Sequence, residues 1–462
     1  MKVLSIIGGL LIFTSAASGQ SLLEGEETGF TSMNPAYVAG PWAEYGVHLS
    51  LVGVGGNAGG NLFQFSIYNK YFAQGQRLET ETVDALLTEW FGLPTRELTA
   101  GAQVFLQPLA LRVQTRSGHG WMVGVWQRGY ARLRTNSGLL DVLLKGPGEP
   151  REVPVRFSLT GVQTMELVLT YAHYFPLAHL AVGISPRWIR GGAYVNAQFQ
   201  STFQFADSTF TQQFFYTLDV AGIPARLLEG FDLFDNPVLN TRPIDQYMRA
   251  FSGLTSYGSG LGLDLGIAWF PVEDVRVGLA LKDIGTIRWT RESYRYTPVN
   301  TTFQYSGLDW NIEVLEQEYH NDVSAYLQAQ IEDLARGAYE EVQQEARSFE
   351  MSLPTTAYAG VTWKTGSQSA LGGSMRWTLK DTPATFSQKP IFSVAGYTRL
   401  WAFPLIAGVQ WGGERALVVL LGSGVQWGPV AWHVRVVGTP SSALGGRGAF
   451  YGTFLSGLQV HF

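Results

Sequence analysis

Apolar side chains occupy every second position from Leu261 to Trp269, with glycine, aspartate or alanine between them. A short turn at Pro271–Asp274 follows, and the alternation resumes from Val275 to Leu281. Because successive side chains of a strand point to opposite faces, this pattern predicts a hairpin with one apolar face and one small or charged face. Such a hairpin suits a wall between hydrocarbon and water, although a soluble sandwich can show the same alternation.

The same alternation recurs along most of the chain, between short turn signals. Many strands with short connectors indicate an antiparallel meander. Bacterial barrels favour even strand numbers, so we expect about fourteen strands. The predicted fold is therefore all-β, a transmembrane antiparallel β-barrel. The segments that carry its strand signals are 45–67, 106–125, 162–188, 193–220, 261–289, 358–379, 391–437 and 450–462.

Three segments depart from this period. Apolar residues at helical spacing predict a short helix from Arg77 to Phe91, and the proline-containing residues 221–257 predict an ordered loop. Residues 309–350 contain eleven acidic residues and two arginines, a formal charge of −9, and they predict a polar amphipathic helix. If Pro271–Asp274 is a periplasmic turn, this helical insertion lies in an extracellular loop. It is either a solvated helix or a lid, a cation-binding surface or a docking element.

Composition favours the barrel. Only 15% of the 462 residues are charged, whereas soluble domains carry about 25%. No run of about 18 apolar residues, the length of a transmembrane helix, follows the first twenty residues. The 54 glycines and the 13% aromatic residues suit crowded lumen positions, tight turns and interface girdles. The absence of cysteine excludes disulfides and thiolate chemistry, and the net charge of −5 gives no support for nucleic-acid binding.

Both ends of the chain carry signals of export. Lys2, an apolar core and Ala17-Ser18-Gly19 predict a signal peptide over residues 1–19. Residues 20–43 lack strand character and are expected to form an N-terminal hatch or plug, before a barrel that occupies 44–462. The last strand alternates and ends on Phe462, a pattern that resembles the signal by which outer-membrane barrels engage the barrel assembly machinery. The expected location is the bilayer of the bacterial outer membrane.

The chain offers little evidence of enzymatic chemistry. Its seven histidines have no metal-ligand spacing, so no metal site and no cofactor are expected. Gly53-Val54-Gly55-Gly56 is not a dinucleotide fingerprint, because neither a helix nor an acidic ribose partner follows it. An outer-membrane hydrolase with a Ser-His pair is conceivable, but no pair stands out in the sequence. We therefore expect a protein that is not an enzyme.

Charged residues between the apolar positions are expected to face the lumen. They either neutralise one another in a polar interior or form a field that selects anionic groups, including the head group of an amphipathic solute. The candidates for these lumen charges are Arg112, Arg116, Arg128, Asp264, Arg276 and Lys282.

Two motifs carry a family resemblance. Ser32-Met33-Asn34-Pro35-Ala36-Tyr37 follows the predicted signal peptide, and the opening hairpin joins GLGLDLG to KDIGTIRW. Together they resemble an uncharacterised family of Bacteroidetes-type outer-membrane barrels, a domain of unknown function. That family is similar to the FadL-type long-chain fatty-acid transporters and to PorV, a component of type IX secretion.

The resemblance implies a fourteen-stranded barrel with Asn34, Pro35 and Ala36 in a hatch inside the lumen. It implies that the barrel admits or carries hydrophobic or amphipathic solutes, as FadL-like transporters do. The alternative is a PorV-like interaction component that binds a partner in protein secretion or surface assembly. The acidic insertion 309–350 departs from the FadL-type pattern.

Overall fold

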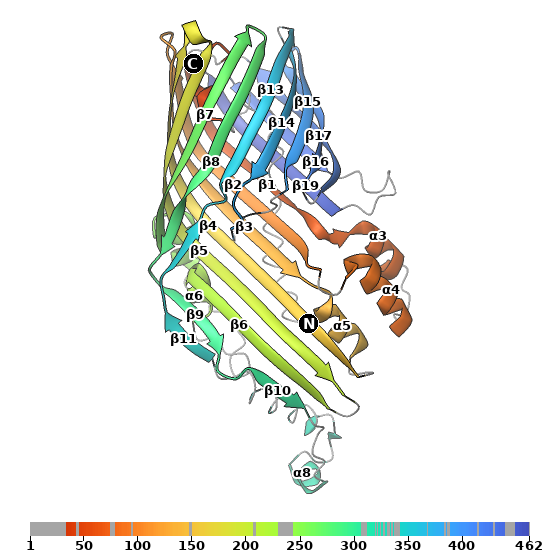
Figure 1. Cartoon of the computed structure of the whole chain (residues 1–462). Coiled ribbons are helices and arrows are strands. Elements are labelled where there is room, and N and C mark those ends of the chain that lie inside the picture. The colour runs from red at the N-terminus through yellow and green to blue at the C-terminus, as the bar shows by residue number, and fades with distance from the viewer. Residues whose placement is uncertain are drawn as a thin grey trace.

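In the computed structural model, fourteen strands pair in an unbroken antiparallel ring (Figure 1). The ring closes where β1 pairs with both β2 and β19. The predicted antiparallel barrel is therefore confirmed. The structure describes residues 34–42, 46–73, 79–93, 96–146, 150–206, 209–229, 244–305, fifteen residues between 312 and 336, 342–366, 368–382, 385, 389–413, 415–427, 430–438 and 449–461. The predicted signal peptide, residues 20–33 and Phe462 lie outside these ranges.

The ring strands follow one another along the chain, except that β5 is followed in the ring by β7, and β8 by β13. Tight turns join β2 to β3, β4 to β5, β7 to β8, β13 to β14, β15 to β16 and β17 to β18. All six lie at one end, here called the short-turn end. The ring strands are β1 (Gly46–Gln64), β2 (Leu98–Gln114), β3 (His119–Thr135), β4 (Arg151–Phe175), β5 (Leu180–Phe205), β7 (Gly258–Val272), β8 (Val275–Trp289), β13 (Thr356–Gly366), β14 (Ser369–Thr378), β15 (Ile391–Leu400), β16 (Phe403–Gly412), β17 (Arg415–Trp427), β18 (Val430–Gly438) and β19 (Ala449–His461).

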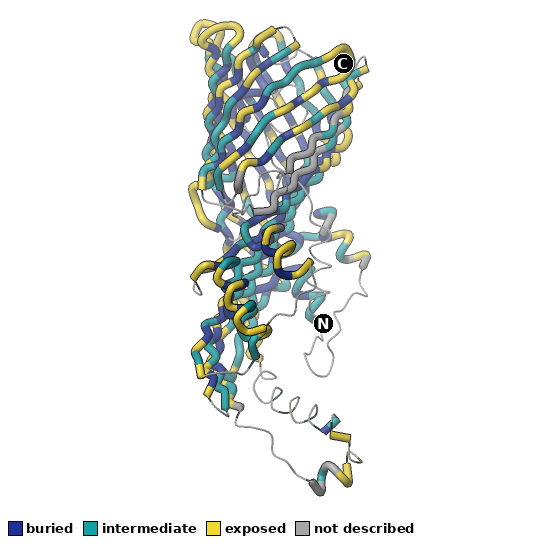
Figure 2. Tube along the Cα trace, turned by 90° about the vertical axis from the view of Figure 1, so that its right-hand side faces the viewer, coloured by how far each residue is buried: buried dark blue, intermediate teal, exposed yellow. Residues whose placement is uncertain are grey.

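The predicted two-faced alternation is visible in the burial of the wall (Figure 2). In β7, exposed Leu265 and Ile267 alternate with buried Asp264 and Ala268. Large apolar side chains on other ring strands are exposed on the same outer face, and together they form an apolar band around the barrel. Tryptophans lie at both margins of this band, with Trp121 near the short turns and Trp188 toward the other end.

The wall is much taller on one side than on the other. β4 and β5 continue past the ring as an open, curved sheet (Figure 1). β5 changes partner after Gly191, since it pairs with β7 up to that residue and with β6 from Ala193 onward. Gly192 is the extra residue of this bulge, and it permits the change. The strands outside the ring are β6 (Phe210–Gly222), β9 (Ser293–Pro298), β10 (Thr302–Tyr305), β11 (Val342–Ala346) and β12 (Phe349–Ser352).

Helical elements other than η1 and η3 lie toward this open end. Within the described residues, no helix is long and apolar enough to cross a bilayer. The helix predicted over Arg77–Phe91 is observed as α4, and the loop predicted over 221–257 contains two short helices. The helical elements are η1 (Pro35–Val38), α3 (Phe65–Ile67), η2 (Tyr68–Phe72), α4 (Thr80–Phe91), α5 (Gly138–Lys145), η3 (Pro176–Ala178), α6 (Ile223–Leu227), α7 (Ile244–Phe251) and α8 (Ile312–Gln317).

The acidic segment 309–350 is not the single helix that its spacing predicts. α8 and several later described residues are helical, but residues 342–346 form strand β11 and Phe349–Ser352 form β12. These two strands pair with β9 and β8. Backbone hydrogen bonds to neighbouring strands therefore override helical spacing at the end of the segment.

Candidate functional site

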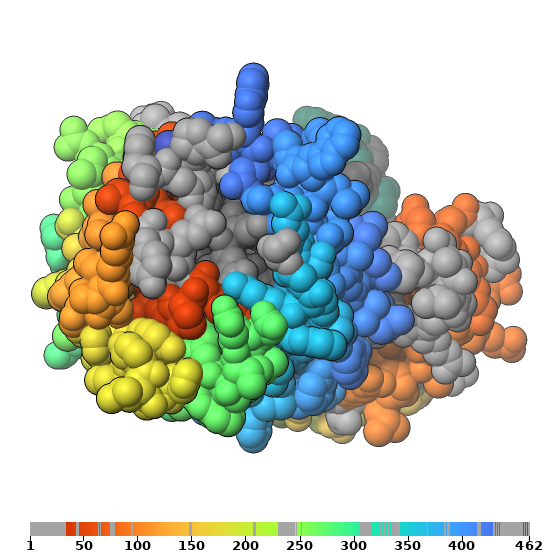
Figure 3. Space-filling model, turned by 90° about the horizontal axis from the view of Figure 1, so that it is seen from above, coloured from red at the N-terminus to blue at the C-terminus, as the bar shows by residue number. Residues whose placement is uncertain are grey.

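Residues 34–42, here called the docked segment, lie inside the barrel at the short-turn end. Figure 3 looks into this end and shows red atoms, from the N-terminal part of the described chain, within the ring. Asn34 caps the turn of η1 by accepting a hydrogen bond from the Ala36 amide at 2.9 Å, and Pro35 supplies a favourable first residue. Asn34 and Ala36 are fully buried and Pro35 is buried with them, so all three predicted hatch residues lie in the lumen.

Glycines in the wall make room for this segment. A Cβ atom at Gly266 would stand 1.9 Å from the Asn34 side-chain oxygen, and one at Gly183 would stand 2.4 Å from the Ala36 nitrogen. The same holds at Gly120, where a Cβ would come within 2.1 Å of the Val38 carbonyl oxygen. Any larger residue at these three positions would therefore collide with the segment.

Hydrogen bonds and cation–π contacts hold the segment in place. The Asn34 amide donates to the carbonyl oxygens of Ile267, at 2.6 Å, and Leu279, at 3.0 Å. The Trp42 indole donates to the carbonyl oxygen of Glu273 at 2.8 Å. Arg276 lies over the rings of Tyr37, at 4.0 Å, and Trp42, at 4.8 Å. The charge of Arg276 therefore stabilises the docked segment.

A buried charge cluster lies beyond the segment, on β3, β4, β5, β7 and β8. Arg187 bonds to Glu166 at 3.0 Å and to Asp264 and Asp283 at 2.7 Å each. Arg128 pairs with Asp283 at 2.9 Å and lies 3.6 Å from Glu166. With buried Lys282, the cluster contains three cations and three anions, so its formal charge is zero.

A β-bulge between β7 and β8 assembles part of this cluster. Leu263 pairs with Ile284 and Leu265 with Leu281, so Asp264 alone faces both Lys282 and Asp283. Asp283 has a positive φ of 58°. Two consecutive residues therefore reach the same interior, and strict alternation could not have predicted this.

The predicted lumen charges separate into four groups. Arg128, Asp264 and Lys282 are in the cluster, and Arg276 contacts the docked segment. Arg112 lies 3.4 Å from a ring nitrogen of His48. The expectation for Arg116 is wrong, because this residue is exposed in the turn after β2, where alternation no longer applies. The cluster also contains three residues that the sequence pattern did not predict, Glu166, Arg187 and Asp283. Their signal in the sequence is a charged residue among the apolar residues of a strand.

Past the cluster, the inner face of the wall becomes apolar and aromatic. Tyr194 stacks near Trp289 and Phe349, with ring centroids 5.4 and 5.8 Å apart. Val162 and Ile189 are buried in the same group, and Tyr130 packs against it. An apolar zone therefore separates the charge cluster from the open end.

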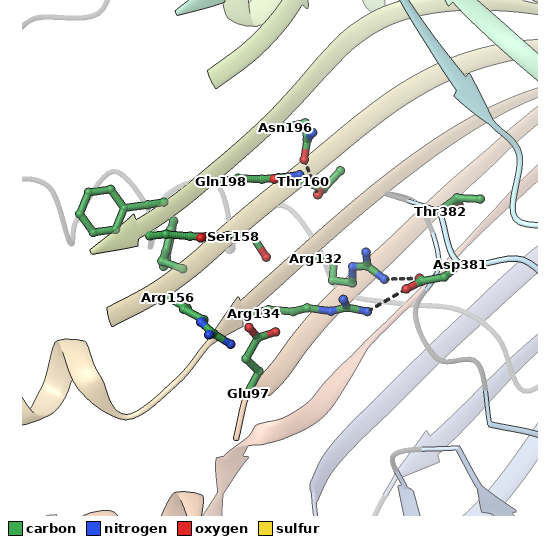
Figure 4. Close-up of a pocket in the computed structure, with 13 residues that line it drawn as sticks. Glu97, Arg132, Arg134, Arg156, Ser158, Thr160, Asn196, Gln198, Asp381 and Thr382 are labelled. Carbon is green, nitrogen blue, oxygen red and sulfur yellow. Dashed lines mark hydrogen bonds and ion pairs between the residues drawn. The ribbon is translucent and has the colours of Figure 1, made fainter. Parts of the chain in front are cut away.

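A polar cavity of about 360 Å³ lies farther out on the same inner face (Figure 4). Arg132 pairs across the strands with Thr160, which pairs with Asn196, and the next row joins Arg134, Ser158 and Gln198. The complete lining is Glu97, Arg132, Arg134, Arg156, Phe157, Ser158, Thr160, Asn196, Gln198, Phe199, Gln200, Asp381 and Thr382.

This cavity carries an excess of positive charge, since it contains three arginines and two acidic residues. Arg132 and Arg134 share one carboxylate, that of Asp381, at 3.1 and 3.5 Å. Exposed Arg156 forms no ion pair with any described residue. An incoming anion could therefore be bound by at least one guanidinium without displacing Asp381.

The family model described as "Family of unknown function (DUF5723)" matches residues 35–403. The chain belongs to this family. The match covers residues 35–42 of the docked segment, the charge cluster and all the lining of the polar cavity, so these features lie within the family's shared region. No curated protein matches the chain.

Solved structures similar to this family member include hydrocarbon channels. A TodX deltaS2S3 mutant, a monoaromatic hydrocarbon channel, has 8% identity and a TM-score of 0.47, with 98% of each chain covered. The CymD monoaromatic hydrocarbon channel has 11% identity and a TM-score of 0.41, covering 93% of this chain and 91% of that one. A Pseudomonas aeruginosa FadL homologue has 12% identity and a TM-score of 0.39, covering 97% and 98%. These values are too low to transfer a function.

Proposed function

We propose that this protein is an outer-membrane channel that admits an amphipathic anionic solute. The apolar band would lie in the bilayer, with the short turns in the periplasm and the open end outside, as is usual for such barrels. The observation that supports the proposal is the order of features along one inner face. The arginine-rich cavity comes first, then the apolar zone, the charge cluster and the docked segment.

This order matches the two parts of an amphiphile. The cavity offers guanidinium groups to a carboxylate, phosphate or sulfonate. An apolar ligand would bind less well there, because the amide and hydroxyl groups of the lining would lose hydrogen bonds to water without gaining new ones. The apolar zone that contains Tyr194 and Trp289 is next along the wall. The docked segment would act as the hatch at the periplasmic end.

Flux into liposomes tests the solute class. The probes are one fluorescent amphiphile with a sulfonate group and the same fluorophore with a quaternary ammonium group, neither of which crosses the bare bilayer. We expect wild-type protein to admit the sulfonate faster than the ammonium. Replacing Arg132, Arg134 and Arg156 with glutamine should slow sulfonate entry by about tenfold, the effect of losing about 1.4 kcal/mol of interaction.

The control is Arg288→Gln, which removes the same charge from an exposed residue outside the cavity. It should leave the entry of both probes unchanged. Sulfonate entry that is equally fast in the triple variant would contradict the anionic preference. Flux no greater than in empty liposomes, even after the hatch is displaced, would contradict the channel itself.

A further inference from the structure

A helical lobe covers the outer face of β1, β2 and β3 at the open end. It consists of α3, η2, α4 and α5 (Figure 1). Val83, Leu87 and Phe91 of α4 pack with Leu98 of β2, and Leu140 of α5 joins them. An ion pair of 2.5 Å between Lys145 and Asp84 connects α5 to α4. The lobe is therefore fixed to the wall through its inner side.

The outer side of the lobe exposes a second apolar surface. Leu139 and Leu143, four residues apart on α5, are exposed, with 66% of Leu143 accessible. Tyr68 and Phe72 stack on η2, with ring centroids 6.4 Å apart, and both are exposed. Phe72 also packs edge-on against Trp90, at 6.3 Å. Contiguous exposed apolar surface is unfavourable in water and marks a contact surface.

The apolar band continues along the wall directly to this lobe. On β2, the outward face runs from exposed Leu109 past the bulge, where Pro108 is exposed, toward buried Leu98. The outward residues on this path are Leu106, Val104, Ala102 and Ala100. On β3 the outward residues from Val123 to Leu133 include no charge. Hydrocarbon that surrounds the band would therefore meet no charged residue on these outer faces before it reaches the lobe.

A second helix also lies against the tall wall. α7 lies against the wall where β5 changes partner, since a Cβ atom at Gly192 would stand 2.8 Å from the carbonyl oxygen of Ala250. Met248 on α7, and Leu254 just after it, are both exposed. Two separate helical elements therefore present apolar side chains where the band ends.

We infer that the helical lobe and α7 rest on the lipid surface of the outer leaflet, with their exposed apolar side chains inserted among the head groups and upper acyl chains. Aromatic rings such as Tyr68 and Phe72 suit this region because each side chain is bulky, and Tyr68 adds a polar tip. The inference rests on the membrane location proposed above but not on the transported solute.

Site-specific fluorescence quenching tests this inference, and the chain contains no cysteine that would complicate labelling. Single cysteines at Phe72, Leu143 and Met248 would carry an environment-sensitive fluorophore in liposomes whose phosphatidylcholine head groups bear a nitroxide. A cysteine at Leu169, exposed on the lipid-facing side of β4, is the positive control for embedding and is read with nitroxide on the acyl chain. A cysteine at Gln344, exposed on β11, is the water-facing control.

We expect the head-group nitroxide to quench labels at Phe72, Leu143 and Met248 at least twofold more than the label at Gln344. Equal, weak quenching at all four sites, with strong acyl-chain quenching at Leu169, would overturn the lipid-surface inference alone. Weak acyl-chain quenching at Leu169 would overturn the membrane location and, with it, the inference. Replacing Leu139 and Leu143 with serine should also lower quenching at Phe72, because the lobe would lose part of its lipid contact.

Discussion

Replacing Gly266 with leucine is expected to displace the docked segment and open the barrel at its short-turn end. A Cβ atom there would stand 1.9 Å from the side-chain oxygen of Asn34 and 2.8 Å from Pro35 Cδ, so the leucine and the segment cannot share the space. Overpacking costs about 1–3 kcal/mol. That cost shifts an equilibrium between docked and released segment by about 5- to 150-fold.

Two measurements detect release of the docked segment in the Gly266→Leu variant. Flux of the sulfonate and ammonium fluorophores should both rise, and protease added at the short-turn side should cut within residues 34–42 sooner than in wild type. The matched control is Gly373→Leu on β14, where a Cβ atom would meet nothing closer than 3.8 Å. Equal flux in wild type and the Gly266 variant, with the segment still protected, would show that residues 34–42 do not bar the lumen.

Replacing Arg187 with methionine should lower the free energy of unfolding by about 3–5 kcal/mol, the usual result of removing one member of a buried ion cluster. Arg187 contacts all three carboxylates, those of Glu166, Asp264 and Asp283, so its loss leaves more buried negative than positive charge. Urea unfolding in detergent micelles, followed by tryptophan fluorescence, measures the effect. Arg190→Met on the same strand is the control, and it should change stability by less than about 0.5 kcal/mol because Arg190 is exposed.

A compensated variant separates charge from packing. Adding Asp264→Asn to Arg187→Met removes one of the unpaired carboxylates and should recover part of the lost stability. If the Arg187→Met protein does not form a barrel, the double variant should still form one that migrates heat-modifiably in gels. That recovery would also show that unpaired charge, rather than lost packing, causes the defect. An Arg187 variant as stable as the Arg190 control would show that the cluster does not stabilise the barrel.

Local alternation was sufficient to predict the strands, because a pleated wall with hydrocarbon outside imposes a period of two on each strand. It predicted the hairpin of β7 and β8 and the barrel. It could not predict which strands pair across long separations, so the change of partner at Gly191 and the pairing of β8 with β13 were not foreseen. Nor could it predict how far β4 and β5 extend, since a strand outside the bilayer has no hydrocarbon to set its length.

The candidate site was only partly predictable for a related reason. The Asn-Pro-Ala motif identified residues of the docked segment, but its glycine contacts depend on wall strands far away in sequence. Asp283 lies in the interior through a bulge, and a period of two assigns it to the outer face. Helical spacing in the acidic segment failed at Val342–Ala346, where pairing with β9 determined the conformation.

The neutrality of the charge cluster has a kinetic consequence on the proposed route. An anion that moves inward from the outer cavity leaves the positively charged cavity behind. The cluster around Arg187 and Arg128 has no net positive charge to attract it, because Glu166, Asp264 and Asp283 already neutralise the cations. The affinity of the cavity for the anion would therefore set the solute concentration at which uptake saturates. The dwell time of a solute deeper in the barrel should not lengthen as its negative charge increases, so a highly charged solute would be captured more readily without being trapped.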